Sequence, residues 1–507
     1  MTAVAPATAA PTRSAVGLRS ERGPILGAIM LTTALVALDS TIIATAVPSV
    51  VKDLGGFSQF PWLFSIYLLT QAVTVPIYGK LADVLGRKPV MMFGIAVFLL
   101  GSVFCGFAWS MPALIAARAL QGIGAGAVQP ISMTIIGDLY TLEERSRVQG
   151  YVAGVWGVAS VVGPTLGGLF SDYASWRGIF FINLPLGLLA AVVLRRRFTE
   201  DVEKRQHTID YAGAGLLTVG CSLLILGLLE GGTAWAWDSA TSVAVLGGGL
   251  VALLAFLRVE SRSAEPVLPL WVFRRRVLVG GNLTALGVGA LLIGLSSYVP
   301  TYVQGVLGTG AVEAGFALAA LTIGWPIAAT LSGRLYLRIG FRDTALLGIA
   351  LVVGGSTLTA MLGARSSVWS VVLAMFVTGT GLGLSSSPTL VAVQSVVGWD
   401  RRGVVTGTNM FCRSMGSAVG AAALGALANA TLSDRFSHAP AAVAARLPRS
   451  ADAAGSSFRR TGGPVGDYVR SALYAASHQV FLALLVAAVL VIGALLLMPR
   501  RTEPLEF

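Results

Sequence analysis

The stretch 33–48 reads TALVALDSTIIATAVP and places one carboxylate, Asp39, inside a long apolar run. The run covers about residues 25–50, and a helix needs about 20 apolar residues to cross a bilayer. An ionisable side chain at that depth costs at least about 2.5 kcal/mol, so such groups usually have a function. The stretch therefore predicts a membrane-spanning helix in which Asp39 faces a polar cavity.

The composition of the whole chain supports a polytopic membrane protein. Its 507 residues are 55% hydrophobic and 12% charged, and the mean hydropathy is +0.77. So apolar a chain cannot cover itself with a soluble surface. The three cysteines lie in apolar segments without ligand-like spacing, so the sequence supports neither a disulfide framework nor a metal site.

Apolar segments of spanning length recur along the chain and predict an all-α bundle of 14 transmembrane helices, because a bilayer admits only helices or closed barrels. They lie near 25–50, 60–78, 89–109, 112–138, 148–171, 178–194, 211–230, 240–258, 277–303, 314–333, 343–364, 368–396, 403–430 and 479–498.

Lysine and arginine in the connections predict the orientation, since cytoplasmic loops carry the excess of positive charge. This bias places both termini in the cytoplasm and accounts for the net charge of +12 without nucleic-acid binding. The expected segments are a disordered tail (1–24), a six-helix half (25–194), a linker (195–210), two inserted helices (211–258), a second linker (259–276), a second six-helix half (277–498) with a long external loop (431–477), and a tail (499–507).

Two similar decapeptides indicate an internal repeat. GKLADVLGRK at 79–88 and GRLYLRIGFR at 333–342 share glycines and basic residues at matching offsets, each after the second helix of a six-helix set. Repeats of this kind place a substrate site near the midplane between two halves that rock to alternate access.

The chain resembles the major facilitator superfamily, and within it the fourteen-helix drug:proton antiporters. The resemblance covers residues 26–499 and is carried by LDSTIIATAVP (38–48), GKLADVLGRK (79–88), RALQGIGAG (118–126), GPTLGG (163–168) and WRGIFFINLPLG (176–187). It implies a proton-driven exporter of small molecules.

The 79–88 motif predicts a charge latch on the cytoplasmic side. Gly79 and Gly86 allow a tight turn and close helix approach, and Asp83 can sit at the N-terminus of a neighbouring helix. Arg87 can reach Asp138 at the internal end of the fourth helix. A solvated loop explains Arg87 but not Asp83. The second copy has Leu337 in place of Asp83, so a symmetric latch is not expected.

The fourth helix predicts a partner for Asp39. Arg118 and Gln121 share one helix face, and Arg118 lies about 9 Å inside the outer end, deep enough to need a partner. Burial favours the protonated form of Asp39 and a nearby Arg118 favours the carboxylate, so a change in their separation could drive proton exchange. The alternative is a purely structural pair.

Residues 163–168 predict a close helix contact. Gly163, Gly167 and Gly168 let helices approach, and Pro164 bends the helix by removing a backbone hydrogen bond. The resemblance implies that this segment seals an interface against proton leak. Ordinary tight packing is the alternative for each glycine.

Several further polar and aromatic side chains could line a central cavity. Arg413 and Asn409 lie one turn apart in the thirteenth helix, and Arg413 could instead anchor to backbone carbonyls. The candidate cavity residues are Gln121, Tyr67, Trp156, Tyr298, Trp325, Asn409 and Arg413.

The leading functional prediction is a proton-coupled antiporter in the plasma membrane that exports amphipathic or cationic small molecules. An importer of the same fold and a non-transporting receptor are the alternatives. An enzyme is not expected, because the histidines lie in loops or at a helix end and no catalytic set lies at bilayer depth. We expect a monomer that binds small-molecule substrate, protons and the lipid bilayer, with no nucleic acid, cofactor or metal.

Overall fold

The computed structural model describes residues 17–55, 62–200, 210–232, 234–263, 266–440, 443 and 463–501. Helices make up nearly all of the regular structure in these ranges, and 14 of them are long and apolar enough to cross a membrane. The predicted all-α bundle with 14 spans is confirmed. Most of the expected N-terminal tail, the middle of the 195–210 linker and much of the 431–477 loop lie outside the described residues.

The first half supplies six spans, the sixth of which is broken into two pieces. Its helices are α1 (Gly23–Leu54), α2 (Trp62–Leu85), α3 (Arg87–Gly106), α4 (Met111–Leu139), α5 (Leu142–Tyr173), α6 (Gly178–Phe181) and α7 (Asn183–Arg197). The short α6 and α7 together form one span.

Two inserted helices and a second set of six spans follow. They are α8 (Tyr211–Glu230), α9 (Ala240–Glu260), α10 (Arg276–Gly305), α11 (Ala311–Ile339), α12 (Phe341–Ala360), α13 (Val368–Ser395), α14 (Arg402–Ser437) and α17 (Gly463–Leu496), with the 3-10 turns η2 (Leu270–Phe273) and η3 (Trp399–Arg401).

The last two spans differ in length from the sequence prediction. Helix α14 continues to Ser437 and α17 begins at Gly463, so both extend into the expected loop 431–477. Hydropathy marks only the apolar part of a helix, whereas backbone hydrogen bonding continues into polar residues beyond it.

Polar residues just before the helices fix where several of them begin. Thr141 and Glu144 form a reciprocal capping box at the start of α5. The Asp210 carboxylate accepts a hydrogen bond from the Gly213 amide at 2.7 Å and caps α8. These caps place helix starts on one face of the molecule, where connections must leave the bilayer.

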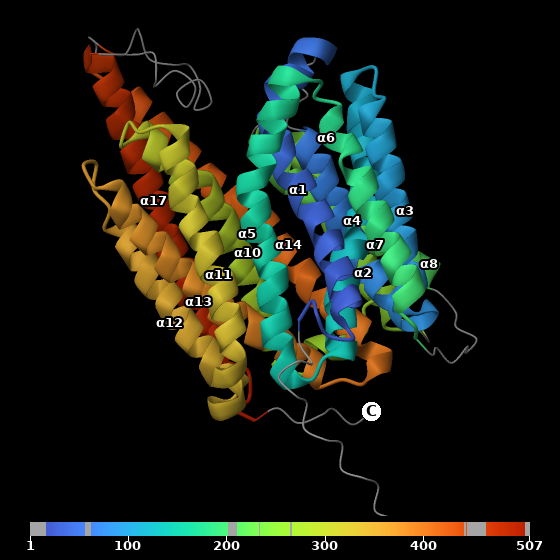
Figure 1. Ribbon diagram of the computed structural model, residues 1–507. Coiled ribbons are helices and arrows are strands. Elements are labelled where there is room, and N and C mark those ends of the chain that lie inside the picture. The colour runs from blue at the N-terminus through green and yellow to red at the C-terminus, as the bar shows by residue number, and fades with distance from the viewer. Residues whose placement is uncertain are drawn as a thin grey trace, which may run out of the picture.

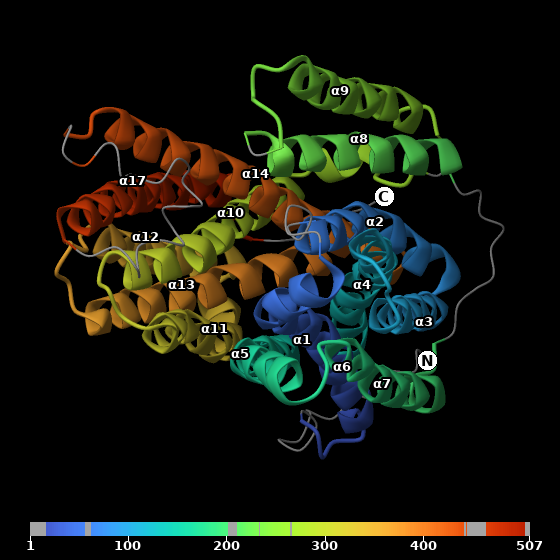
Figure 2. The same cartoon turned by 90° about the horizontal axis from the view of Figure 1, so that it is seen from above.

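The six spans of each half form two adjacent groups (Figures 1 and 2). Seen from above, α8 and α9 lie at the periphery, with α8 beside α2 and α14. Each half has buried apolar clusters of its own, and a further cluster joins α2, α8 and α14. The principal contacts between the halves pair α5 with α11 and α2 with α14.

We call the face where α1 begins and α17 ends the terminal face, and the other end of the bundle the opposite face. In Figure 1 the terminal face is at the bottom, where the ribbons of the two halves converge. On the opposite face Asp53, at the end of α1, accepts a hydrogen bond from Arg177 at 2.6 Å. That bond, with a second from Trp176, lowers the pKa of Asp53 below its ordinary value.

Candidate functional site

Asp39 lies at the centre of a buried polar network inside the first half. Arg118 of α4 donates to Asp39 Oδ2 at 2.5 Å, and Gln121 donates to Oδ1 at 2.7 Å. Asn183, the first residue of α7, donates to the same Oδ1 at 3.2 Å. Three donors from two other helices therefore surround this carboxylate.

The guanidinium of Arg118 is held from several directions. Its Nε donates to the carbonyl of Leu63 at 3.1 Å, and its Nη1 also donates to Gln121 Oε1 at 2.7 Å. Its Cζ lies 4.1 Å from the centroid of the Tyr67 ring, a distance typical of cation–π contact. Arg118 thus connects α2, α4 and α1 through one side chain.

A second layer of polar residues orients the first. Ser102 Oγ of α3 accepts hydrogen bonds from Gln121 at 2.8 Å and from Asn183 at 3.2 Å. The thiol of Cys105 lies 3.7 Å from Gln121 Oε1. The sequence did not predict Ser102 or Asn183 as members of this network. Asn183 could have been found as an asparagine in an apolar segment, two residues before Pro185.

The network is sealed from solvent, which differs from the expectation that Asp39 faces a polar cavity. Asp39 and Arg118 are each 1% exposed, and Gln121 and Tyr67 are equally buried. Gln121 and Tyr67 therefore belong to the Asp39 network in this conformation and do not line an open cavity. Most of the buried polar atoms of the network are paired with one another, whereas the Tyr67 hydroxyl and Asn183 Oδ1 have no hydrogen-bond partner among the described residues.

At the terminal face, Asp83 bridges the two halves. Its Oδ1 accepts from the Gly403 amide at 2.8 Å and its Oδ2 from the Val404 amide at 2.7 Å. Both amides belong to the first turn of α14, where free N–H groups and the helix dipole favour an anion. The side chain therefore caps a helix of the other half, in the arrangement that the sequence suggested.

Arg87 sits between two carboxylates beside this cap. Its Nη2 lies 3.0 Å from Asp83 Oδ1, and its Nε lies 2.9 Å from Asp138 Oδ2. Gly86, just before it, has a φ of 97°, a conformation that glycine adopts at little cost. Gly79 lies against Gly403 on α14, where the two backbones touch.

The second half contributes two partners of Arg87 and Asp138 that the sequence did not predict. The Trp399 carbonyl accepts from Arg87 Nη2 at 2.5 Å, and the Trp399 ring lies 3.7 Å from Arg87 Cζ. Arg402 pairs with Asp138 and donates to the Gly137 carbonyl at 2.9 Å. Only one indication of these two residues was present in the sequence: Trp399 lies in the loop before the thirteenth span, and Arg402 begins that span.

The second copy of the motif forms a different contact. Leu337 is 48% exposed and takes no part in a capping interaction. Its neighbour Tyr336 donates its hydroxyl to the Leu142 carbonyl at the start of α5. A Cβ on Gly333 would meet the Ser146 side chain. The pseudo-equivalent interface is therefore closed by packing and by neutral hydrogen bonds, which include one from the Ser387 hydroxyl of α13 to Gln149 of α5.

The glycines of the 163–168 segment differ in how closely helix α5 packs around them. A Cβ on Gly163 would collide with Thr41 of α1, whose hydroxyl donates to the Ala159 carbonyl at 3.0 Å. Gly167 is buried, whereas a Cβ on Gly168 would meet nothing within 4 Å. Pro164 lies inside the continuous helix. The close approach predicted for this segment thus lies between α5 and α1 at Gly163.

The remaining candidate cavity residues are spread over both halves. Trp156 and Trp325 are half-buried against the cores of their own halves. The Tyr298 hydroxyl donates to the Leu424 carbonyl at 3.2 Å, and Asn409 donates to the Gly281 carbonyl at 3.0 Å. Arg413 is partly exposed on α14.

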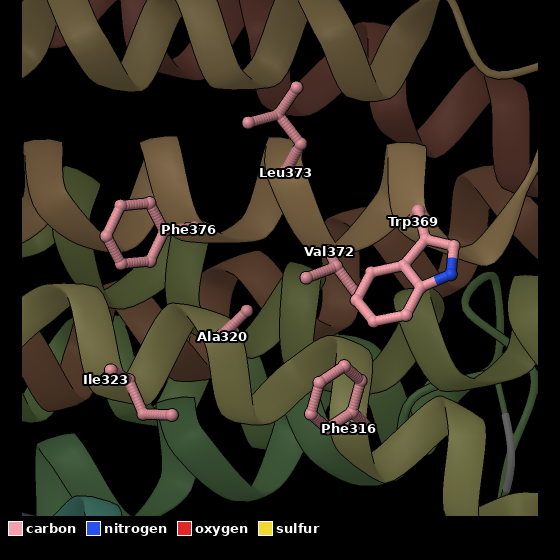
Figure 3. Close-up of a pocket in the computed structure, with 7 residues that line it drawn as sticks. All are labelled: Phe316, Ala320, Ile323, Trp369, Val372, Leu373 and Phe376. Carbon is pink, nitrogen blue, oxygen red and sulfur yellow. The ribbon is translucent and has the colours of Figure 1, made fainter.

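An apolar groove of about 390 Å³ lies between α11 and α13 (Figure 3). It is lined by Phe316, Ala320, Ile323, Trp369, Val372, Leu373 and Phe376. Its aromatic residues are largely exposed and Trp369 lies at the start of α13, as for a surface that faces lipid near the interface. The groove is separate from the Asp39 network.

Comparison with known proteins places this architecture in a family. Residues 29–421 match the sequence profile of the Major Facilitator Superfamily. The multidrug transporter protein MdtP of Bacillus subtilis (strain 168) is 36% identical over 414 residues, which are 82% of this chain and 76% of the relative. Multidrug resistance protein 3 of the same organism is 35% identical over 418 residues, 82% of this chain and 80% of the relative.

A solved structure shares the fold at low identity. The human organic anion transporter MFSD10 (TETRAN) superposes with a TM-score of 0.62 and 15% identity, over 94% of this chain and 99% of that one. Two halves of six spans, the motifs at 79–88 and 118–126 and the profile match lead to one conclusion: this chain belongs to the Major Facilitator Superfamily.

Proposed function

We propose that the protein is a proton-coupled antiporter that exports amphipathic small molecules, cationic ones included, by alternating access. The observation that carries the proposal is the buried Asp39–Arg118 pair, an acid and a base that face each other at bilayer depth. Export of several compounds is supported by the relatives, two of which are named as multidrug transport or resistance proteins.

The network gives Asp39 two states with different partners. In the observed arrangement Arg118, Gln121 and Asn183 all donate to it, which stabilises the carboxylate. A movement that separates α1 from α4 removes the opposite charge of Arg118, and where the carboxyl stays buried the protonated acid is then favoured. Proton uptake and release at Asp39 would thereby follow the movement of the helices.

The terminal face supplies the second element of alternating access. Asp83 and Arg402 tie the halves together there, and Tyr336 adds a contact at the other seam. We propose that the terminal face is cytoplasmic and that these contacts break when the transporter opens inward. The positive-inside bias of the connections supports this orientation in the plasma membrane.

Proton entry can supply the energy for export. The membrane potential contributes about 2.3 kcal/mol per charge per 100 mV, which corresponds to roughly a fifty-fold concentration gradient. Because the Asp39–Arg118 pair that would exchange the proton lies within one chain, we propose that a single chain is the working unit.

The test uses Asp39→Asn, which mimics the protonated acid and keeps the side-chain shape. Proteoliposomes with an imposed pH gradient would report export of a fluorescent drug. We expect uphill export to be lost, with folded protein retained, because the neutral amide cannot exchange a proton.

Asp53→Asn is the matched control, since Asp53 lies on the same helix but at its exposed end. We expect this variant to keep uphill export. If Asp39→Asn still moved the drug uphill with unchanged proton dependence, the proton site would lie elsewhere. If the wild type showed no flux driven by a pH gradient, the antiporter assignment itself would be wrong.

A further inference from the structure

Arg413 lies on the same side of α14 as two residues that contact or approach the other half. Arg402, Thr406 and Arg413 recur at helical spacing, so they share one side of the helix. Arg402 contacts Asp138 of α4. Thr406 accepts from Gln394 of α13, whose amide also donates to the Met133 carbonyl of α4 at 3.1 Å. Arg413 continues this side of the helix deeper into the bundle.

Neighbouring parts of α14 pack against other helices. Phe411 and Met415, on the opposite side of the helix, pack against the cluster shared with α2 and α8. Asn409 and Gly416, which flank Arg413, contact α10, where a Cβ on Gly416 would collide with the Leu286 carbonyl. Arg413 is about 11 residues, or roughly 16 Å, from the start of α14, which places its partly exposed side chain deep in the bundle.

In the part of the chain that the structure describes, the Arg413 side chain makes no hydrogen bond and no ion pair. Only its backbone carbonyl is engaged, by Ser417 at 3.2 Å. The buried acids are engaged by other groups: Asp39 by Arg118, and Asp83 by Arg87. Glu260 accepts from the Leu268 amide at the terminal end of α9. An arginine at this depth is costly without a counter-charge, so Arg413 is poised to accept an anion.

A second unpaired donor belongs to Asn282 of α10, the hydrogen-bond partner of Asn409, which lies one turn before Arg413 on α14. Asn409 donates to Asn282 Oδ1 at 3.3 Å, and Asn282 Nδ2 is buried with no acceptor among the described residues. Buried amide donors are normally paired, so this nitrogen needs an explanation. A ligand with an acceptor group that extends from Arg413 to the contact between α10 and α14 would give Asn282 Nδ2 a hydrogen-bond partner.

We propose that Arg413 binds an anionic group of the transported molecule. This inference rests on the proposed export function and narrows its substrate class to amphipathic molecules that carry a carboxylate, sulfonate or phosphate, either as anions or as zwitterions. The Asp39 carboxylate is enclosed by donors of its own half, so it does not offer a competing contact to a cationic group in this conformation. Guanidinium groups suit planar acids because they donate two parallel hydrogen bonds.

The anchoring role that the sequence left open predicts different behaviour. An arginine that ties helices together needs carbonyl partners, and its removal lowers stability. A buried arginine that is unpaired until a ligand binds lowers the stability of the ligand-free protein. Arg413→Met should therefore leave the melting temperature of the ligand-free protein unchanged or raise it.

The experiment uses two xanthene dyes that differ only in one group, a free carboxylate in one and its ethyl ester in the other. Equilibrium binding is measured with purified protein in nanodiscs, without a pH gradient. Arg413→Gln should weaken binding of the acid dye by about 10- to 100-fold and change binding of the ester by less than about threefold, because only the acid forms the charge-assisted contact. Arg413→Lys should retain part of the affinity for the acid.

The control is Arg365→Gln, which removes one positive charge from the exposed connection between α12 and α13. It should bind both dyes as the wild type does. The proposal is overturned if Arg413→Gln weakens both dyes equally, if it leaves the acid dye unaffected, or if the wild type does not prefer the acid to the ester.

The binding and transport measurements test the substrate class and the antiporter function independently of each other. If a pH gradient drives dye export in proteoliposomes but Arg413→Gln shows no selective loss for the acid, the antiporter assignment stands and the substrate class is wrong. If the selective loss is found in nanodiscs while no pH-driven export occurs, Arg413 binds anions and the antiporter assignment is wrong.

Discussion

At the scale of single residues, Asp83 shows how one carboxylate can hold two halves of a protein together. Both of its oxygens are occupied by amides of the first turn of α14, and Arg87 lies beside them. A hydrogen bond to a charged group contributes about 1.5–3 kcal/mol, more than a neutral one. Loss of this charge should therefore shift the balance between the closed and open terminal face.

The Asp83→Asn substitution removes this charge and keeps the shape of the side chain. We expect the initial rate of drug export in proteoliposomes to fall by about tenfold or more, while expression and membrane insertion stay near wild type. Leu337→Asn makes the corresponding change in the second copy of the motif, where the side chain is exposed. That control should export normally. An unchanged rate in Asp83→Asn would remove the latch from the mechanism.

At the scale of elements, α2 and α14 approach each other backbone to backbone. A Cβ on Gly79 would lie 2.7 Å from the Gly403 carbonyl oxygen and 3.3 Å from Gly407 Cα. Main-chain atoms cannot move aside as a flexible side chain can, so any larger residue must push the helices apart. This glycine contact sets how closely the halves can meet at the terminal face.

We therefore predict that Gly79→Ala favours the state with an open terminal face. Spin labels on exposed Leu85 and Asp400, which lie in different halves, should show a larger population of long distances. Gly154→Ala is the matched control, because a Cβ there would meet nothing within 4 Å. If both variants gave the wild-type distance distribution, the glycine contact would not limit closure.

At the scale of the whole molecule, charge at the helix ends governs how the bundle sits in the membrane. The ends at the terminal face carry Arg195, Arg196 and Arg197, which close α7. On the opposite face, α14 ends at Ser437 and the chain returns at Gly463. The positive-inside bias predicts that the arginine-rich end lies in the cytoplasm.

Single cysteines can test this orientation. With the three native cysteines replaced, Ser437→Cys should react with a membrane-impermeant maleimide on intact cells. Arg196→Cys should react only after the membrane is permeabilised, because both positions are exposed but lie on different sides. Labelling in the reverse pattern would contradict the orientation and the assignment of the terminal face to the cytoplasm.

The 14 spans could be predicted from the amino-acid sequence, because every backbone polar group in a bilayer must be paired within its own helix, and long apolar runs satisfy that locally. The sequence also indicated that Asp39 and Arg118 need partners, since a charge at that depth is costly alone. Both inferences depend on the energy of one residue or one segment in the membrane. They need no knowledge of which helices are neighbours.

Which helices and side chains are neighbours became known from the folded structure. Asn183 donates to Asp39 from 144 residues away, and Ser102 of α3 accepts from Asn183. The Trp399 carbonyl accepts from Arg87 across 312 residues. The fold also seals the Asp39 network within one half, and it leaves the Arg413 side chain without a hydrogen bond or ion pair among the residues that the structure describes. Such contacts follow from the packing of complementary helix surfaces, which depends on many side chains at once and leaves no periodic signal in the chain.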